Sequence, residues 1–366
     1  MAGLDDKRRA ELARAISAIE NSDALDSGLI PRGYARYAGM RIVGITGPPG
    51  SGKSTMVDGL AAQWAEQGLQ MAVIAVDPSS PFSGGAVLGD RFRMRRAEER
   101  GDIFIRSIAA RGHPGGLGAA VPDICIALAA FGIERVLLET VGSGQTDVDI
   151  KDHADTIVVT SVPGLGDSMQ ASKAGIMEIG DIYAVNKSDL PGADRVRSDI
   201  EAMLHLAYQS LTASPRTGAS RRRASRGEQM LMDRHGAANE APAWEPPVVP
   251  IAAGTGEGME RLSESIGRHL AWLDQSRHFE GHRLAMQRVQ LSQRIWRELR
   301  QRLVERRVGD TDQLSHWAGR ILAAEVTLED ALADILGGET KRPPVQPSRQ
   351  DVPSRPDNRQ RRRLES

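Results

Sequence analysis

Short runs of aliphatic and β-branched residues recur along this chain, and stretches with helical spacing separate them. The runs predict seven strands, at Arg41–Thr46, Met71–Asp77, Ile103–Ser107, Arg135–Glu139, Thr156–Val162, Ile182–Asn186 and Val248–Ile251. Strands that alternate with helices favour a parallel sheet covered on both faces, since each crossover helix packs on the sheet. The pattern therefore predicts an α/β fold with a mostly parallel sheet.

Helical patterns without strands flank this region. Residues 7–20 place Leu12, Ile16 and Ile19 on one face of a helix, which predicts an N-terminal helical extension. Residues 277–337 contain no strand pattern, and leucine and isoleucine recur there at helical spacing. A second helix is expected from Thr311 through Leu322, and a third from Thr327 to Leu336. Such an apolar stripe must be buried, and packing on its own domain and dimerisation both satisfy that need.

Composition changes mark the remaining segments. Residues 213–243 and 339–366 are rich in arginine, proline and small polar residues. Neither can bury enough apolar surface to offset the entropy lost on ordering. We therefore predict four parts: a helical extension at 1–38, a P-loop domain at 39–275 with a disordered insertion at 213–243, a helical arm at 276–338 and a disordered basic tail at 339–366.

Charge and cysteine content exclude several classes of protein. The formal net charge is −1, which argues against a nucleic-acid protein held by bulk charge. Cys125 is the only cysteine, so neither a disulfide scaffold nor a multi-thiolate metal site within one chain is expected. The apolar run 124–133 is shorter than the roughly 20 residues of a membrane span, and the acidic N-terminus lacks the features of a signal peptide. We expect a cytoplasmic protein with no membrane partner.

The first strand runs into a phosphate-binding motif. The residues after Thr46 have the form G-x-x-x-x-G-K-S, with glycines that let backbone N–H groups surround phosphates at a helix N-terminus. Lys53 is expected to reach the β- and γ-phosphates, and the Ser54 hydroxyl to bind magnesium. The predicted phosphate-binding residues are Gly47, Pro48, Pro49, Gly50, Ser51, Gly52, Lys53, Ser54 and Thr55.

A second motif selects the base. Asn186, Lys187 and Asp189 form N-K-x-D at the end of the sixth predicted strand. A carboxylate there can accept hydrogen bonds from the N1–H and the exocyclic amine of guanine. Adenine offers neither donor on that edge, and a buried carboxylate left unpaired costs about 1–3 kcal/mol or more. The motif therefore predicts that the nucleotide is GTP.

Three acidic residues lie where chain order places magnesium ligands and switch groups. Asp77 ends the second predicted strand, Asp90 lies in a glycine-rich loop, and Glu139 ends the fourth strand. Glu139 begins the pattern E-x-x-G, in which the Gly142 amide is expected to meet the γ-phosphate and to lose that contact on hydrolysis. Gln145 is a candidate for orienting the attacking water.

These motifs, together with their neighbours, are similar to those of a known family. The strings that carry the resemblance are Val76–Ser80, Gly84–Met94, Glu139–Gln145, Pro163–Asp167, Lys173–Glu178 and Gly256–Gly258. In their residues and in their order along the chain, these motifs resemble those of the MeaB/ArgK/MMAA-type GTPases of the G3E group, which are SIMIBI-class P-loop proteins. The likeness extends over residues 5–337.

The resemblance implies a homodimeric GTPase, with 276–338 as the dimerisation arm, that acts as a chaperone for an adenosylcobalamin-dependent acyl-CoA mutase. Such a protein gates cofactor loading and protects or reactivates the mutase, which is of the methylmalonyl-, isobutyryl- or 2-hydroxyisobutyryl-CoA type. The partner rather than this chain binds adenosylcobalamin, and an adenosyltransferase is a further candidate partner. Mg²⁺ accompanies GTP or GDP in this chain.

The family pattern also assigns residues. It places magnesium ligands at Asp77, Asp90 and Glu139, and a second guanine contact at Ala252-Ala253, where the family usually has Ser-Ala. It assigns the segment 163–173 to a switch that reports nucleotide state to the mutase, through Gly164, Gly166, Asp167 and Lys173. The chain departs from the family at Lys173-Ala174, where two adjacent lysines are common, and at the long insertion 213–243. These departures leave the choice of mutase open.

Two other classes remain as alternatives. A metallochaperone GTPase would share the P-loop but would need Cys/His clusters near the switches, whereas this chain has one cysteine and the scattered histidines His113 and His153. A kinase of a small substrate or transport protein would need an acceptor site, and the N-K-x-D motif favours a GTP switch instead.

Overall fold

The computed structural model describes eleven segments of the chain and divides it into two units. The described residues are 4–20, 29–78, 103–110, 120–140, 148–164, 177–213, 243–275, 278–305, 311–323, 325–328 and 330–331. The first unit spans residues 1–293 and the second spans 294–366. We describe each unit by itself.

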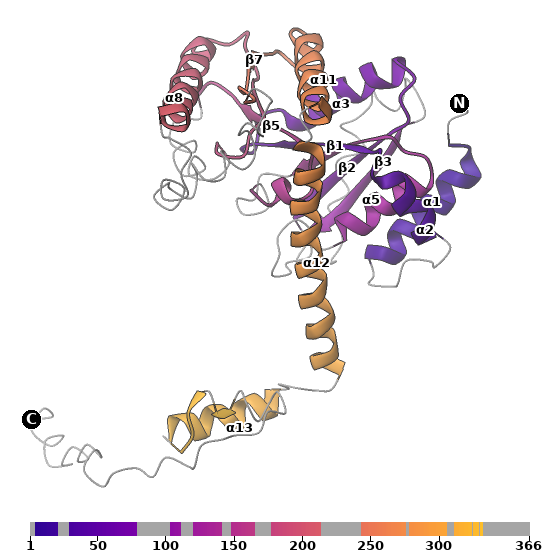
Figure 1. The fold of residues 1–366 in the computed structure, drawn as a ribbon, viewed down its shortest axis with the longest axis vertical. Coiled ribbons are helices and arrows are strands. Elements are labelled where there is room, and N and C mark those ends of the chain that lie inside the picture. Colours follow the sequence, from indigo (N-terminus) through magenta and orange to yellow (C-terminus); the bar gives the residue numbers. More distant parts are fainter. Residues whose placement is uncertain are drawn as a thin grey trace, which may run out of the picture. The chain divides into compact units, whose positions relative to one another are not determined.

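A seven-stranded parallel sheet forms the centre of the first unit (Figure 1). Its strand order is β3-β2-β4-β1-β5-β6-β7, and every neighbouring pair is parallel. The predicted fold class is thus confirmed, and each predicted strand is present with ends shifted by at most three residues. The strands are β1 Arg41–Thr46, β2 Met71–Pro78, β3 Phe104–Ala110, β4 Arg135–Thr140, β5 Thr156–Ser161, β6 Ile182–Val185 and β7 Val248–Pro250.

Side chains alternate between the two faces of this sheet, as the period of two requires. On one face, Ile42 and Leu138 join the core beneath α1, α2, α5 and α8; on the other, Val43 and Leu137 join the core beneath α3 and α11. Helices therefore cover both faces. Among its described residues, the helices of the first unit are α1 Asp6–Glu20, α2 Leu29–Tyr37, α3 Lys53–Glu66, α5 Val121–Ala130, the 3₁₀ turn η1 Ile150–Asp152, α8 Ala193–Ala213, α11 Met259–Gln275 and the first part of α12 His278–Glu305.

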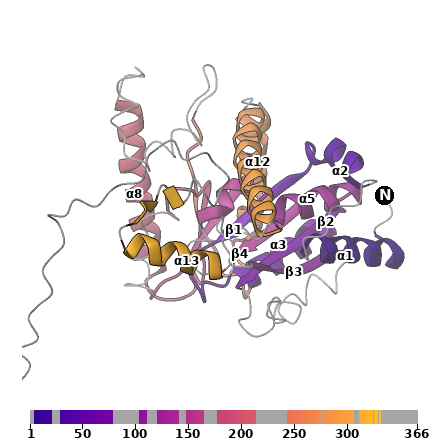
Figure 2. The ribbon, with the colours of Figure 1, turned by 90° about the horizontal axis from the view of Figure 1, so that it is seen from below.

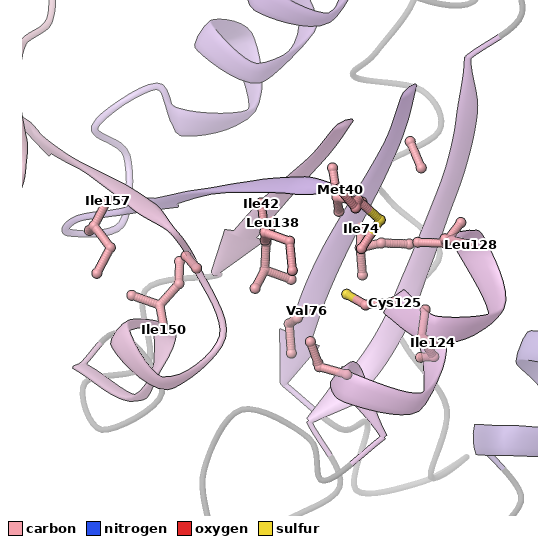
Figure 3. Packing of buried hydrophobic residues seen from close by; sticks show 14 of the residues in the cluster. Met40, Ile42, Ile74, Val76, Ile124, Cys125, Leu128, Leu138, Ile150 and Ile157 are labelled. Atoms are coloured by element: carbon pink, nitrogen blue, oxygen red, sulfur yellow. The ribbon is translucent and has the colours of Figure 1, made fainter. Parts of the chain in front are cut away.

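The N-terminal helices share the core of the sheet domain. Figures 1 and 2 show α1, α2 and α5 lying together beside the sheet, and Leu12, Ile16 and Tyr37 are buried in the same cluster as Cys125. Figure 3 shows Cys125 and its neighbours from α5 packed against Ile74 and Val76 of β2. The helix α2 was not recognised in the sequence, because its short pattern LIPRGYARY contains both proline and glycine.

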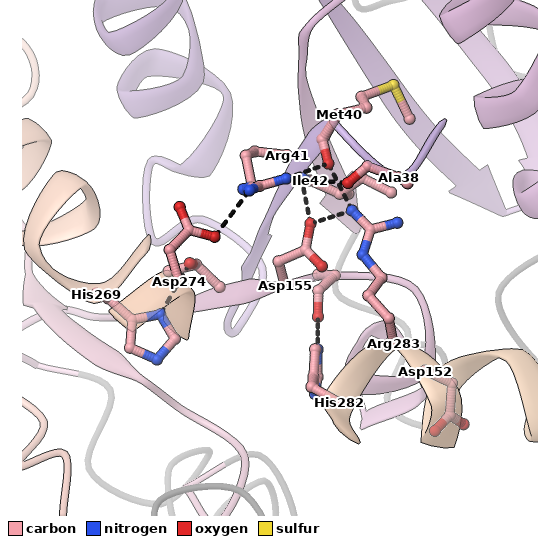
Figure 4. A network of polar contacts seen from close by, with 12 residues as sticks. Ala38, Met40, Arg41, Ile42, Asp152, Asp155, His269, Asp274, His282 and Arg283 are labelled. Atoms are coloured by element: carbon pink, nitrogen blue, oxygen red, sulfur yellow. Dashed lines mark hydrogen bonds and ion pairs between the residues drawn. The ribbon is translucent and has the colours of Figure 1, made fainter. Parts of the chain in front are cut away.

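The first turns of α12 are fastened to the amino-terminal ends of β1 and β5 (Figure 4). Arg283 donates to the Met40 carbonyl at 2.6 Å and to the Asp155 carboxylate at 2.7 Å. Its guanidinium lies over the rings of Tyr37 and Phe279, at 4.7 and 5.0 Å from their centroids. The beginning of the predicted arm therefore packs on its own domain.

The second unit contains the end of α12 and the helix α13, Thr311–Leu322, with the bounds that the sequence predicts. Thr327 begins a further helical turn: its hydroxyl accepts from the Asp330 amide at 3.1 Å and donates to the Asp330 carboxylate at 2.7 Å. This is the start predicted for the third helix, whose remainder lies outside the described residues. The tail 339–366 lies outside them entirely, and so does nearly all of the insertion 213–243.

Candidate nucleotide-binding site

The loop 47–52 joins β1 to α3 at the carboxyl edge of the sheet. Gly47, Gly50 and Gly52 have φ values of 144°, 73° and 84°, which side-chain-bearing residues rarely adopt. A Cβ on Gly47 would lie 2.4 Å from the Thr160 carbonyl oxygen, and one on Gly52 would lie 2.3 Å from the Asn186 amide nitrogen. Backbone conformation therefore favours glycine at all three positions, and close packing against β5 and Asn186 requires it at Gly47 and Gly52.

Lys53, the first residue of α3, points back into this loop. Its Nζ donates to the carbonyl oxygens of Gly47 at 2.8 Å and Pro48 at 3.0 Å, and the residue is only 6% exposed. The ammonium thus lies inside the loop, at the positive N-terminal end of a helix of 14 residues. An anion entering the loop would meet this charge together with the N-terminal backbone amides of α3.

Ser54 and Glu139 meet at the centre of the site. The Ser54 hydroxyl donates to the Glu139 carboxylate at 2.6 Å, and Glu139 is 1% exposed. They meet because β4 lies directly beside β1, with Glu139 in register with Ile45. A hydroxyl and a carboxylate side by side are oxygen ligands of the kind that Mg²⁺ prefers, so this pair fits that ion.

Asp77 belongs to the same edge of the sheet. Its strand β2 pairs with β4 so that Val76 is in register with Thr140, which places Asp77 just past the end of that pairing. Other residues that the sequence singled out lie outside the described residues, so the structure does not place them: Asp90, Gly142, Gln145, Gly166, Asp167 and Lys173. Gly164 is described, in a turn after β5 with φ 84°.

Asn186 fastens three loops to one another. It is 3% exposed, and its amide nitrogen donates to the Ser51 carbonyl at 2.7 Å. Its carbonyl oxygen accepts from the backbone amides of Lys187 at 2.8 Å and Ala253 at 3.0 Å. The structure therefore gives Asn186 a positioning role between the phosphate loop and the two loops expected to hold the base.

The base loop, residues 186–189, is held on one side and open on the other. Lys187 has φ 57°, and its Nζ donates to the Gly50 carbonyl at 3.1 Å. Asp189 is exposed at the end of this turn, while the neighbouring Ser188 amide donates to the Ile251 carbonyl at 2.9 Å. A ligand can thus approach the Asp189 carboxylate from solvent.

The Ala252-Ala253 segment is more constrained than the sequence suggested. The Ala252 amide donates to the Glu257 carbonyl at 2.9 Å, and the Ala253 amide donates to Asn186. Both residues are buried. A contact from either amide to guanine O6 would require that amide to exchange its acceptor.

Comparison with known proteins agrees with this geometry. The family model of the methylmalonyl-CoA mutase-associated GTPase MeaB matches residues 12–312. A relative from Pyrococcus horikoshii is 41% identical over 268 residues, which cover 73% of this chain and 76% of that protein. The chain belongs to the MeaB family of GTPases.

Relatives of this MeaB-family chain include GTPase ArgK of Escherichia coli, which is 35% identical over 206 residues, covering 54% of this chain and 62% of that protein. The mouse methylmalonic aciduria type A homolog is 31% identical over 281 residues, covering 72% and 60% of the two chains. A crystal structure described as an LAO/AO transport system kinase has a TM-score of 0.58 and 21% identity, covering 90% and 93%; this likeness shows the fold alone. Family membership makes the chain a nucleotide-binding enzyme that hydrolyses GTP.

The structure also brings together two hydroxyl groups that the motifs did not single out, those of Thr46 and Thr140. The Thr140 hydroxyl donates to that of Thr46 at 3.0 Å, beside Glu139, and both residues are fully buried. The Ser51 hydroxyl is buried and has no hydrogen-bond partner among the described residues. The available signal was position: Thr46 directly precedes the phosphate loop of this MeaB-family chain, and Thr140 directly follows Glu139.

One absence bears on the metallochaperone alternative. The described residues contain no group of three or more His, Cys, Asp or Glu side chains placed to hold a metal ion. Burial raises the pKa of the Cys125 thiol to about 12, and it lowers that of His153 to about 4. Among the same residues, no helix is both long and apolar enough to cross a bilayer.

Proposed function

We propose that this GTPase uses its nucleotide state to gate cofactor loading into an adenosylcobalamin-dependent acyl-CoA mutase, and to protect or reactivate that mutase. The family description, mutase-associated GTPase, supports this proposal, and so does the name of the mouse relative, which refers to methylmalonic aciduria. The observation that carries the nucleotide chemistry is the contact of Ser54 with Glu139 beside the buried ammonium of Lys53.

In this proposal the phosphate loop binds GTP by exchanging internal contacts for phosphate contacts. Lys53 releases the carbonyls of Gly47 and Pro48 and takes up β- and γ-phosphate oxygens, which spreads the charge that develops during transfer. Ser54, Asp77, Asp90 and Glu139 would hold Mg²⁺, which would supply additional neutralisation of the phosphate charge. Gln145 orients the attacking water, and the Gly142 amide meets the γ-phosphate.

The base is recognised by Asp189, whose carboxylate accepts from guanine. Asn186 keeps this loop in register with the phosphate loop through its contact with Ser51, so base and phosphates are held at a fixed separation. Lys187 adds a second tie through the Gly50 carbonyl. A nucleotide that fills only one half of the site gains less from this preorganisation.

Coupling to the mutase is assigned to the segment 163–173. It follows β5, whose last residues lie beside the phosphate loop at Thr160 and Gly47. Gly164 and Gly166 allow the segment two backbone arrangements, and Asp167 and Lys173 supply charges whose pairing differs between them. The mutase then binds the two nucleotide states with different affinity, and linkage requires an equal effect of the mutase on nucleotide affinity. Two such chains associate through the arm 276–338.

The competing classes receive less support. A metallochaperone would need a ligand cluster, and the described residues hold none. Cys125 and His153 are both buried, and burial raises the pKa of the Cys125 thiol, which disfavours the thiolate that would bind a metal ion. A kinase would require an acceptor for the phosphoryl group other than water.

The test is phosphate release in the presence of purified mutases of the methylmalonyl-, isobutyryl- and 2-hydroxyisobutyryl-CoA types. We expect one of them to accelerate hydrolysis by the wild-type chain. Lys53→Ala should abolish turnover with and without mutase. Lys173→Ala should bind nucleotide normally but lose most of the acceleration. If no mutase binds or accelerates hydrolysis, the chaperone proposal fails while the GTPase activity stands. Phosphate release without any acceptor would exclude the kinase alternative.

A further inference from the structure

A groove of about 790 Å³ runs along the outer edge of the sheet, far in sequence from the phosphate loop. Its floor is β7, the last strand of the sheet, and α8 and α11 contribute its walls. The volume falls in the range of roughly 300–1,000 Å³ that is common for ligand sites. Nothing in the GTPase site uses this groove, so its lining calls for a separate explanation.

The strand edge offers backbone groups to the groove. The Tyr183 amide donates to the Pro247 carbonyl, and the Ile251 amide donates to the Val185 carbonyl. In a parallel ladder, alternate residues of a strand direct their backbone N–H and C=O groups toward the same neighbouring strand. Pro247 and Ile251 bond to β6, so Val248 and Pro250 direct their backbone groups away from β6, toward the groove. Proline has no N–H, and therefore Val248 alone presents both a donor and an acceptor. An added chain could gain one pair of hydrogen bonds but could not build a long ladder.

The walls carry positive charge. Arg261 and Arg268 are seven residues apart on α11, which places them on the same face two turns from each other. Arg268 donates to the Ser265 hydroxyl at 3.0 Å, which holds its guanidinium along the helix. Arg197 of α8 adds a third guanidinium, which already pairs with Glu201 at 2.8 Å, so Arg261 and Arg268 carry most of the positive charge; Glu264 is the one carboxylate among the described lining residues.

We propose that this groove docks an extended acidic segment of a partner protein. Guanidinium groups bind carboxylates with two parallel hydrogen bonds, so the arginines supply most of the attraction. The Val248 backbone pair then sets the direction of the segment beside β7. The proposal goes beyond the GTPase site and does not depend on the residue roles proposed there.

Charge favours a separate partner over the chain's own insertion. Residues 214–242, which connect α8 to the strand, contain six arginines and three acidic residues. The tail 339–366 is also basic. Either segment would bring like charge into a groove that already has an excess of arginine, and like-charge contacts are unfavourable.

The binding test uses the full-length protein and a fluorescein-labelled peptide of alternating glutamate and valine, followed by fluorescence anisotropy. We expect binding that weakens as salt is added, because exposed charge pairs are screened. The double variant Arg261→Ala/Arg268→Ala should raise Kd by about tenfold. The matched control Arg221→Ala/Arg222→Ala removes the same charge from the insertion and should leave Kd unchanged. GTP hydrolysis should be unaffected in both variants.

A charge reversal gives a gain of binding as a second measurement. Arg261→Glu should bind a lysine–valine peptide better than the wild type does. Absence of binding by the wild-type protein, an equal loss in the insertion control, or no gain in the reversed variant would each overturn the proposal. Displacement of the peptide by tripolyphosphate at lower concentration than by unlabelled peptide would instead assign the groove to small polyanions. Tighter binding of a single-stranded oligonucleotide would assign it to nucleic acid.

Discussion

The side chain of Asn186 offers the most direct test of how the site is assembled. Its amide joins the Ser51 carbonyl at 2.7 Å to the backbone amides of Lys187 and Ala253 at 2.8 and 3.0 Å. We therefore consider Asn186→Ala, which removes all three bonds and leaves the backbone of the loops in place. The substitution separates a positioning role from direct contact with the base.

The size of the effect follows from burial. Ser51 and Ala253 are buried, so water cannot readily replace the lost partners, whereas Lys187 is exposed and its amide can bind water. Each buried backbone group left unpaired costs about 1–3 kcal/mol. Two such groups predict that the free energy of unfolding falls by about 2–6 kcal/mol. The loss falls where the loops meet, so affinity for GTP should fall as well.

The assay combines urea unfolding of the free protein with titration of a fluorescent GTP analogue. Asp189→Asn is the comparator, because Asp189 is exposed and its loss should leave the unfolding midpoint unchanged. Asn186→Asp keeps the acceptor oxygen but replaces the donor to Ser51 with a second oxygen, so it should also be destabilised. If Asn186→Ala unfolds at the wild-type urea concentration and binds GTP with wild-type affinity, the positioning role is refuted.

Three further predictions concern the base, the α12 attachment and pH. Asp189→Asn should weaken the binding of GTP and favour the binding of xanthosine triphosphate, since the new amide can donate to the carbonyl that xanthine has in place of the guanine amine. Competitive titration of the two nucleotides measures this preference, and an unchanged preference would contradict the prediction. Arg283→Ala should lower the free energy of unfolding by about 3–5 kcal/mol, because it removes the guanidinium that pairs with the buried carboxylate of Asp155. Arg283→Lys keeps the positive charge, so denaturant unfolding should show a smaller loss of stability for that variant. His153 is 1% exposed, and burial lowers its pKa from 6.5 to about 4. The fold accommodates only the neutral imidazole, so the free energy of unfolding should be highest above pH 6.5 and should fall by about 3 kcal/mol as the pH falls to 4. His153→Leu should flatten this pH dependence, as measured by unfolding across the same range.

The local pattern of apolar and polar residues was sufficient to predict most strands and helices of the fold. The β-branched runs are buried on both faces, as a parallel sheet covered by helices requires, and this burial is visible in the sequence as continuous apolar stretches. The phosphate loop was equally accessible, because its glycines and Lys53 act within nine consecutive residues. The helix α2 was missed, since its nine residues contain a proline and a glycine, and only the structure shows that Gly33 permits its close crossing over Ile126 of α5.

The order of the strands was decided only by the tertiary structure. The placement of β4 between β2 and β1 brings Glu139 onto Ser54, 85 residues earlier in the chain. The docking of the base loop on the phosphate loop makes Asn186 a tie to Ser51. Spacing along the chain records which face of an element is buried, but it does not record which distant polar group completes a buried hydrogen bond. Those pairings follow from how whole elements pack, because a buried polar group must find its partner wherever the fold brings one.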